Sequence, residues 1–108
     1  MLFRSLGAAG FTLESGLADA TDEEAQIKRS MVAAAREIIA IVDRTKWERA
    51  AFATFCPTDK ISLVLTDGGA PEAMVRELER RAIAVRLIGA DGVSPTAARI
   101  SDATRPSR

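Results

Sequence analysis

The sequence contains no histidine, a single cysteine and no excess of either charge. Without histidine, Ser-His-Asp triads, histidine general bases and zinc sites with histidine ligands are excluded. The 15 Lys and Arg residues balance 15 Asp and Glu residues, whereas a nucleic-acid-binding surface normally carries a basic excess. Cys56 cannot form an internal disulfide, and with no histidine to activate it we expect a buried, unreactive thiol.

Long apolar runs and the common nucleotide-binding motifs are also missing. No apolar stretch approaches the roughly 20 residues that a helix needs to span a bilayer, and the N-terminus shows no signal-peptide pattern. Neither the dinucleotide fingerprint G-x-G-x-x-G nor the phosphate loop G-x-x-x-x-G-K-S/T is present. We therefore predict a cytoplasmic chain with no membrane partner, no metal site and no nucleotide cofactor.

What the sequence does contain is enough for one small globular domain. It has 108 residues, of which 47% are hydrophobic and 28% are charged, an ordinary composition for a folded domain. A strand pattern begins at Met1 with no preceding cap or tail, whereas most domains start with a few loose residues. We therefore expect this domain to be the later part of a larger unit.

Strand and helix patterns alternate along the chain. Apolar β-branched runs predict strands, and helical periodicity behind a capping signal predicts helices. The predicted elements are a strand at residues 1–6, a loop at 7–20, a helix at 21–36, a strand at 37–43, a short strand at 51–55, a strand at 61–67, a helix at 71–82 and a strand at 83–88. This order is typical of an α/β fold with βαβ units, in which an open sheet carries helices on its faces. Residues 1–89 then form the domain, and residues 90–108, which have no periodicity, form a flexible tail.

The two helix patterns indicate which side chains are buried. In the first helix Thr21 is the predicted N-cap, and Glu24 stands at the spacing of a capping box. Its predicted apolar stripe consists of Ile27, Met31, Ala34 or Ala35, and Ile38. In the second helix the predicted buried residues are Val75, Leu78 and Ala82, and the predicted surface ion pairs are Glu72 with Arg76 and Glu77 with Arg81.

Four loops follow the carboxyl ends of the predicted strands. They are residues 7–10, residues 43–46, residues 66–69 and Gly89. In an open α/β sheet, ligands bind in the crevice beyond the carboxyl ends of the strands. If the strands are parallel, these loops share one edge of the sheet, and we expect the functional site there.

Two pairs of an acid and a lysine lie in or near these loops, and each has two interpretations. Asp43 and Lys46 either hold the hydroxyls and the phosphate of a polar ligand, or Asp43 caps the following turn and Lys46 is solvated. Glu24 and Lys28 either point into the crevice at a helix N-terminus, or form an ordinary helix pair at i, i+4.

Glycine and tryptophan mark three further positions at this edge. Gly7 and Gly10 would let backbone amides approach a ligand closely, because glycine has no side chain in the way. Gly68 and Gly69 are interpreted as turn residues. Trp47 either lines a ligand pocket or covers the edge of the sheet, and covering is the interpretation that we favour.

Taken in order, these residues resemble a known family. The residues that carry the resemblance are Leu6-Gly7-Ala8-Ala9-Gly10, Gly16-Leu17, Glu24-Ala25-x-x-Lys28-Arg29-x-Met31, Ile41-Val42-Asp43-x-x-Lys46-Trp47 and Thr66-Asp67. Their order and spacing over residues 2–88 resemble the C-terminal sensor domain of DeoR-family transcriptional repressors. Two positions depart from the family pattern: Trp47 stands where Phe is more frequent, and Arg44-Thr45 replaces a small polar pair.

The resemblance implies both a fold and a function. The fold would be a three-layer α/β sheet similar to ribose-phosphate isomerase, glucosamine-phosphate deaminase and CoA-transferase domains, and this chain would hold its C-terminal portion. The domain would bind a phosphorylated sugar or a related metabolite without catalysis, within a homo-oligomer. DNA would be bound only through a separate N-terminal helix-turn-helix, which is absent from this sequence. The effector site would be bordered by Gly7, Gly10, Glu24, Lys28, Asp43 and Lys46.

Two other interpretations stay open. The chain could be a fragment of a sugar-phosphate isomerase or deaminase on the same fold, because a carboxylate and a lysine suffice for proton transfer. It could also be an isolated half-domain that dimerises through an unpaired edge strand.

Overall fold

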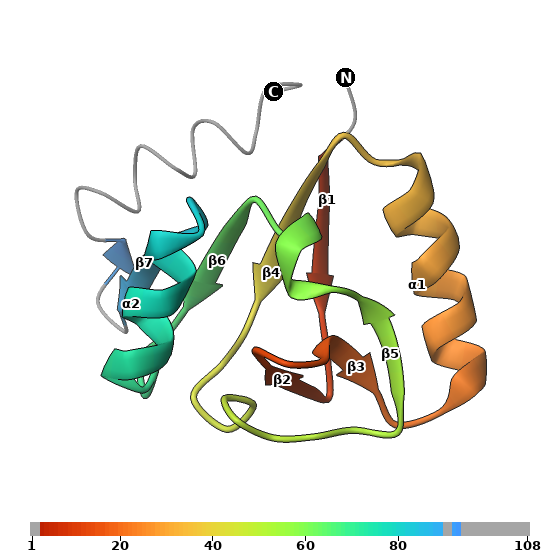
Figure 1. Cartoon of the computed structure of the whole chain (residues 1–108), viewed down its shortest axis with the longest axis horizontal. Helices are drawn as coiled ribbons and strands as arrows, with labels where there is room; N and C mark the ends of the chain where they lie inside the picture. The colour runs from red at the N-terminus through yellow and green to blue at the C-terminus, as the bar shows by residue number, and fades with distance from the viewer. Residues whose placement is uncertain (1–2, 90–91, 94–108) are drawn as a thin grey trace.

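The computed structural model describes residues 3–89 and 92–93. Its strands are β1 (Phe3–Gly7), β2 (Gly10–Thr12), β3 (Gly16–Asp19), β4 (Glu37–Ile41), β5 (Ala53–Cys56), β6 (Leu63–Thr66), β7 (Ala84–Gly89) and β8 (Gly92–Val93). Its helices are α1 (Asp22–Ala34), the 3-10 helix η1 (Thr58–Lys60) and α2 (Glu72–Arg80). Every predicted helix and strand is present, with ends that differ by a few residues, and the fold is a mixed α/β arrangement (Figure 1).

The larger sheet has five strands in the order β1-β4-β6-β7-β8. β1, β4, β6 and β7 are parallel, and β8 pairs with β7 in the antiparallel sense. The connections β1 to β4, β4 to β6 and β6 to β7 all step to the neighbouring strand in the same direction. Because such crossovers are right-handed, the connecting segments lie on one face of the sheet. Accordingly, α1 and α2 both contribute to one core cluster with β4 and β6 (Figure 1).

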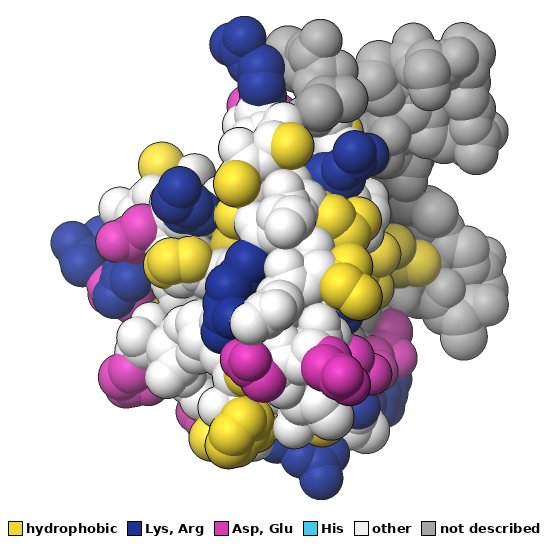
Figure 2. Space-filling view, turned by 90° about the vertical axis from the view of Figure 1, so that its right-hand side faces the viewer, with side chains coloured by type: hydrophobic (Ala, Val, Ile, Leu, Met, Phe, Trp, Pro, Cys, Tyr) yellow, Lys and Arg dark blue, Asp and Glu magenta, His cyan; other side chains and the backbone are white. Residues whose placement is uncertain are grey.

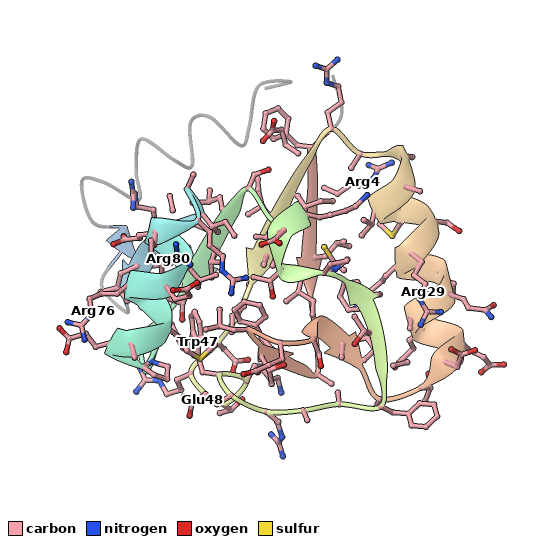
Figure 3. The ribbon with its side chains drawn as sticks, in the orientation of Figure 1. Arg4, Arg29, Trp47, Glu48, Arg76 and Arg80 are labelled. Atoms are coloured by element: carbon pink, nitrogen blue, oxygen red, sulfur yellow. The ribbon has the colours of Figure 1, made fainter. Side chains whose placement is uncertain are left out.

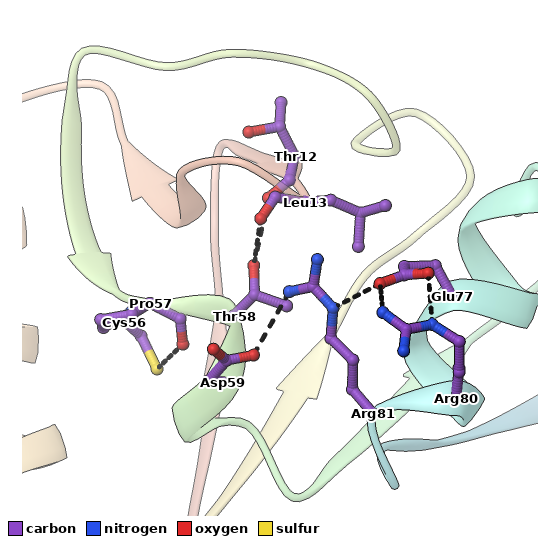
Figure 4. Close-up of polar contacts among 9 residues, drawn as sticks. All are labelled: Thr12, Leu13, Cys56, Pro57, Thr58, Asp59, Glu77, Arg80 and Arg81. Carbon is purple, nitrogen blue, oxygen red and sulfur yellow. Dashed lines mark hydrogen bonds and ion pairs between the residues drawn. The ribbon is translucent and has the colours of Figure 1, made fainter.

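β2, β3 and β5 form a second, antiparallel sheet that the sequence did not predict. The expectation of a loop over residues 7–20 is wrong where β2 and β3 lie, because Phe11 and Leu17 are completely buried in the main core. Strands of 3 and 4 residues are too short to show a clear alternating pattern. Thr58 holds the turn between them by donating its hydroxyl to the carbonyl oxygen of Leu13 at 2.9 Å (Figure 4).

α1 buries only part of the stripe that its periodicity predicts. Met31, Ala35 and Ile38 pack on the core as expected, whereas Ile27 is 66% exposed, so the prediction is wrong for Ile27. Ala25 and Val32, which were not predicted, are buried instead. The helix turns toward the second sheet, where Arg29 donates to the carbonyl oxygen of Thr54 at 2.8 Å. Hydrophobic side chains are correspondingly visible among the charges on the side of the molecule that carries α1 (Figure 2).

α2 packs as predicted at its centre but not at its ends. Leu78 is completely buried, as expected, and Val75 is half-buried. Met74 is buried although it was not predicted, and Ala82 is exposed. The chain leaves the helix at this point, where Ala82 adopts a left-handed φ of 67°, so its side chain no longer follows the helical face.

The predicted helix cap and the first predicted ion pair are confirmed. The amide of Glu24 donates to the hydroxyl oxygen of Thr21 at 3.2 Å and so satisfies one of the free donors at the start of α1. Glu72 and Arg76 form the predicted pair on α2, with 3.5 Å between nitrogen and oxygen. Both side chains are well exposed, so this pair contributes only a few tenths of a kcal/mol.

The second predicted ion pair belongs to a larger group of charges (Figure 4). Glu77 binds Arg81 at 2.7 Å, as predicted, and also binds Arg80 at 2.7 Å. Arg81 extends further and binds Asp59 at 3.2 Å, which connects α2 to η1. The hydrogen bonds from Arg80 and then Arg81 lower the pKa of Glu77 to about 2.

Two residues that we expected to be structural are buried. Cys56 has no exposed surface, and burial raises the pKa of its thiol to about 11, as expected for an unreactive cysteine. Trp47 is 7% exposed, and its ring meets that of Phe11 edge to face, with 5.5 Å between the ring centres.

The predicted tail at residues 90–108 lies outside the described residues, apart from 92–93 in β8. Among the described residues, α1 is the longest helix with 13 residues, and no helix has the length and apolar character needed to cross a membrane.

Candidate effector site

Four parallel strands end at one edge of the larger sheet. Gly7, at the end of β1, lies in register with Ile41, at the end of β4. β6 continues this edge, because the amide of Val42 donates to the carbonyl oxygen of Leu65 at 2.9 Å. The prediction that the loops share one edge is therefore confirmed. We call the loops at this edge the carboxyl rim: residues 7–10, 43–46 and 66–69.

Lys28 reaches the carboxyl rim from α1. Its Nζ donates to the carbonyl oxygen of Gly7 at 2.7 Å and lies 2.9 Å from Oδ2 of Asp19. It also lies 4.9 Å from the ring centre of Phe55, within cation–π range. The Asp19 side chain is 6% exposed and that of Lys28 is 27% exposed, so the ion pair is largely buried. The interpretation of Lys28 as a surface partner of Glu24 is therefore wrong, and Asp19 is a site residue that sequence reasoning missed.

Asp43 caps the turn that follows β4, as one of its two interpretations predicted. Its Oδ1 accepts the hydroxyl of Thr45 at 2.5 Å and the amide of Thr45 at 2.8 Å. These hydrogen bonds hold the pKa of Asp43 below its ordinary value, and the positive charge of Lys46 acts in the same direction. The carboxylate is exposed and remains ionised at neutral pH, so Oδ2 can still accept hydrogen bonds from a ligand.

Lys46 is half-buried and forms no ion pair within the part of the chain that the structure describes. Its backbone is held on two sides. Its amide donates to the carbonyl oxygen of Asp43 at 3.0 Å, and its carbonyl oxygen accepts the amide of Phe11 at 3.0 Å. The backbone of this loop is thus fixed, while the nearest charge acting on the ammonium group is the exposed carboxylate of Asp43, which is not in direct contact with it.

The remaining predicted site residues are Glu24, Gly10 and Gly7. Glu24 is exposed in the first turn of α1, and its carboxylate forms no hydrogen bond or ion pair with the described residues. Gly10 is required for packing, because a Cβ there would lie 2.0 Å from the carbonyl oxygen of Arg49. Gly7 has open space, since a Cβ there would meet nothing within 4 Å. The described contacts join Gly7 to Lys28, but they join neither Glu24 nor Gly10 to the other predicted residues.

Arg44 and Asp67 connect two loops of the carboxyl rim and were not predicted to do so. The Arg44 amide donates to Oδ1 of Asp67 at 2.9 Å, and its guanidinium group donates to the Asp67 carbonyl oxygen at 3.2 Å. Gly69 has a φ of 73°, and a Cβ there would lie 2.7 Å from that of Arg44. The turn role predicted for Gly68 and Gly69 is confirmed, and at Gly69 it also permits close packing of the two loops.

A cavity of about 200 Å³ opens beside the ends of β4 and β6. Its lining includes the apolar side chains of Ile41, Leu65 and Ile88 together with Asp43 and Asp67. Apolar walls with a few polar groups are typical of small-molecule sites, but of the predicted site residues only Asp43 belongs to this lining. Across residues 3–89 and 92–93, no group of three His, Cys, Asp or Glu side chains could hold a metal ion.

Comparison with known proteins agrees with the family resemblance found in the sequence. Residues 3–68 match the family described as the DeoR C terminal sensor domain. The "Putative aga operon transcriptional repressor" of Escherichia coli O157:H7 is 30% identical over 89 residues, which are 82% of this chain and 32% of the relative. The HTH-type transcriptional regulator GlpR of Haloferax volcanii is 32% identical over 89 residues, which are 82% of this chain and 33% of the relative. The HTH-type transcriptional repressor GlcR of Bacillus subtilis is 28% identical over 78 residues, which are 72% of this chain and 30% of the relative.

The match to the family extends from β1 through β6. It contains all of the predicted site residues, together with Asp19, Arg44 and Asp67. The chain spans about a third of the length of the curated relatives that it matches. Because the family match covers more than half of the chain, the chain belongs to the DeoR C terminal sensor domain family.

Proposed function

We propose that the chain is the effector-sensing portion of a DeoR-type transcriptional regulator, and that it binds a phosphorylated sugar or a related metabolite without catalysing a reaction. The names of the relatives, all transcriptional repressors or regulators, support the regulatory role. The observation that carries the ligand class is the group of charges at the carboxyl rim, where Lys28 arrives from α1 and Asp43 and Lys46 from the loop after β4.

Each of these side chains has its own task in the proposed site. Lys46 has no ion-pair partner in the described portion, and it binds the phosphate as a point charge. Asp43 is ionised and accepts hydrogen bonds from sugar hydroxyls. Lys28, held in place by Asp19, adds a second positive charge beside the open space at Gly7.

Glu24 and Gly10 complete the proposed site. The Glu24 carboxylate forms no hydrogen bond or ion pair with the described residues, so it can accept hydrogen bonds from the ligand. Gly10 allows β2 to approach the backbone of Arg49 closely, and it thereby sets the distance between β2 and the segment that follows Lys46.

The finer fold assignment and the partners belong to the same proposal. The sheet with both helices on one face is the C-terminal portion of a three-layer fold similar to ribose-phosphate isomerase, with another layer on the opposite face. In the full-length regulator, a separate N-terminal helix-turn-helix binds DNA, and the regulator is a homo-oligomer. The relatives are about three times as long as the stretch that matches this chain, which leaves room for both additional parts.

A thermal-shift panel tests the proposal, because a ligand that binds only the native state raises the melting temperature. The chain is heated with hexose phosphates, with the same sugars unphosphorylated, and with inorganic phosphate. We expect one hexose phosphate to raise Tm more than its sugar or inorganic phosphate does. Lys46→Met should abolish this shift, and Lys60→Met, at another lysine without an ion pair in the described residues, should retain it. A panel without a shift, or a shift that survives Lys46→Met, would contradict the proposal.

The alternative is a fragment of a sugar-phosphate isomerase or deaminase on the same fold. The observation that favours it is the ionised carboxylate of Asp43 near the positive charge of Lys46, since such groups can exchange protons with a substrate. Turnover of a bound sugar phosphate, followed by NMR and lost in Asp43→Asn or Glu24→Gln, would establish the enzyme. Binding without turnover would support the sensor.

A further inference from the structure

Trp47 is fixed on one side to the strand that follows the first loop of the carboxyl rim (Figure 3). It forms a parallel bridge with Phe11 in β2. The Phe11 amide donates to the carbonyl oxygen of Lys46 at 3.0 Å, and the Glu48 amide donates to the carbonyl oxygen of Phe11 at 2.9 Å. The rings of Phe11 and Trp47 meet edge to face at an angle of 64°. The loop after β4 is therefore attached to β2 by backbone and side chain together.

On its other side Trp47 is hydrogen-bonded to the end of β6. Its Nε1 donates to the hydroxyl oxygen of Thr66 at 3.1 Å. That hydroxyl donates to the carbonyl oxygen of Gly68 at 3.1 Å and accepts the Gly68 amide at 3.3 Å. A hydroxyl has one proton and two lone pairs, so these three bonds use its full capacity. Trp47 and Thr66 are both buried, and breaking this network would leave polar groups unpaired and away from water.

We propose that Trp47 is a positioning residue for the effector. Its indole nitrogen holds the loop after β4, and with it Asp43 and Lys46, at a fixed distance from the turn after β6. Three loops of the carboxyl rim then keep one arrangement before the ligand arrives, which lowers the cost of ordering them on binding. This inference rests on the proposed function, and it adds Trp47 and Thr66 as residues that act on the ligand through Asp43 and Lys46.

Removing the hydrogen bond without removing the ring separates this role from simple packing. Trp47→Phe keeps an aromatic ring against Phe11 but lacks the N–H donor. Thr66→Val removes the acceptor, and Thr66→Ser retains it. Ile83→Val is the matched control, because Ile83 is 3% exposed and precedes β7 at the opposite end of the sheet. This change should lower stability without touching the carboxyl rim.

Calorimetric titration at a temperature where all variants are folded measures the affinities. The probes are the hexose phosphate with the largest shift in the thermal panel and inorganic phosphate. Trp47→Phe should weaken binding of the hexose phosphate about fivefold, as expected for one hydrogen bond of ordinary net strength. Thr66→Val also removes the two bonds to Gly68 and should weaken binding at least as much. The double variant, with Trp47→Phe and Thr66→Val together, should lose no more affinity than the weaker-binding single variant, because both changes break the hydrogen bond between Trp47 and Thr66. Inorganic phosphate should bind the variants and the wild type alike, and Thr66→Ser and Ile83→Val should bind the hexose phosphate as the wild type does.

The possible failures are distinguishable. If the wild-type chain binds no hexose phosphate, the proposed function fails and the inference fails with it. If the wild type binds but Trp47→Phe changes only the melting temperature, Trp47 merely stabilises the fold and the inference is wrong. Additive losses of affinity in the double variant would also overturn the inference, and so would weaker binding of the hexose phosphate by Ile83→Val.

Discussion

Replacing Lys28 in α1 by methionine is expected to destabilise the protein, because the change leaves the carboxylate of Asp19 in β3 without its positive partner. Methionine keeps an unbranched apolar stem but removes the ammonium group that lies 2.9 Å from Oδ2 of Asp19 and 2.7 Å from the carbonyl oxygen of Gly7. The Asp19 side chain is 6% exposed, so water can only partly replace the lost cation. The carboxylate at the end of β3 is then buried without its partner.

The structure sets the size of the effect. Removing one partner of a buried ion pair costs about 3 to 5 kcal/mol. The Lys28 side chain is 27% exposed, which places this pair at the lower end of that range. We therefore expect the free energy of unfolding to fall by about 3 kcal/mol, and Tm by roughly 13 °C for a domain of this size.

Urea titration followed by circular dichroism measures this loss. Lys60→Met is the matched control: Lys60 is exposed and forms no ion pair in the described ranges, so its change should stay within about 0.5 kcal/mol. Adding Asp19→Asn to Lys28→Met removes the stranded charge and should restore part of the stability. The reasoning is refuted if Lys28→Met is as stable as Lys60→Met, or if the double variant is no more stable than Lys28→Met.

Three other predictions concern the packing and the stability of the fold. Gly10→Ala should lower the free energy of unfolding by about 3 kcal/mol, because its Cβ would lie 2.0 Å from the carbonyl oxygen of Arg49. Gly7→Ala is the control and should be about as stable as the wild type, because its Cβ would meet open space. Equal urea midpoints for the two variants would contradict this prediction. The pKa of Glu77 is lowered from 4.5 to about 2 by its two arginine partners, so the stability that it adds is present above about pH 4.5 and disappears as the pH falls toward 2. The Tm difference between wild type and Glu77→Gln should shrink over that range, and a constant difference would be the opposing result. Cys56 is fully buried, and the pKa of its thiol is about 11; it should react with a thiol reagent at neutral pH only after urea unfolds the chain, whereas rapid labelling of the native protein would show that it is accessible.

Local patterns were sufficient to predict the main sheet and its helices. The apolar runs at residues 37–43 and 61–67 predicted β4 and β6 because strands buried on both faces need a continuous hydrophobic sequence. Thr21 marked the start of α1, and the spacing of Glu72 and Arg76 predicted their ion pair, since both depend on neighbours within one helical turn. The common edge of the candidate site followed from the alternation of strands and helices alone.

The second sheet and the buried face of α1 could not be predicted in the same way. β2 and β3 are very short, and β5, which completes their sheet, lies more than thirty residues further along the chain. Ile27 has the spacing of a core residue, yet α1 leaves it 66% exposed. Periodicity shows that a helix has an apolar side, but the neighbouring elements decide which side is covered.

The residues of the candidate site also differ in how far the sequence could predict their roles. The sequence by itself determined which residue types are present, the absence of histidine chemistry, and the loops in which Asp43 and Lys46 lie. Only the tertiary structure decided that Lys28 pairs with Asp19 rather than Glu24, and that Trp47 is hydrogen-bonded to Thr66. The physical reason is that hydrogen bonds and ion pairs act over a few ångströms, so their partners are chosen by the crossing of strands and helices and not by distance along the chain.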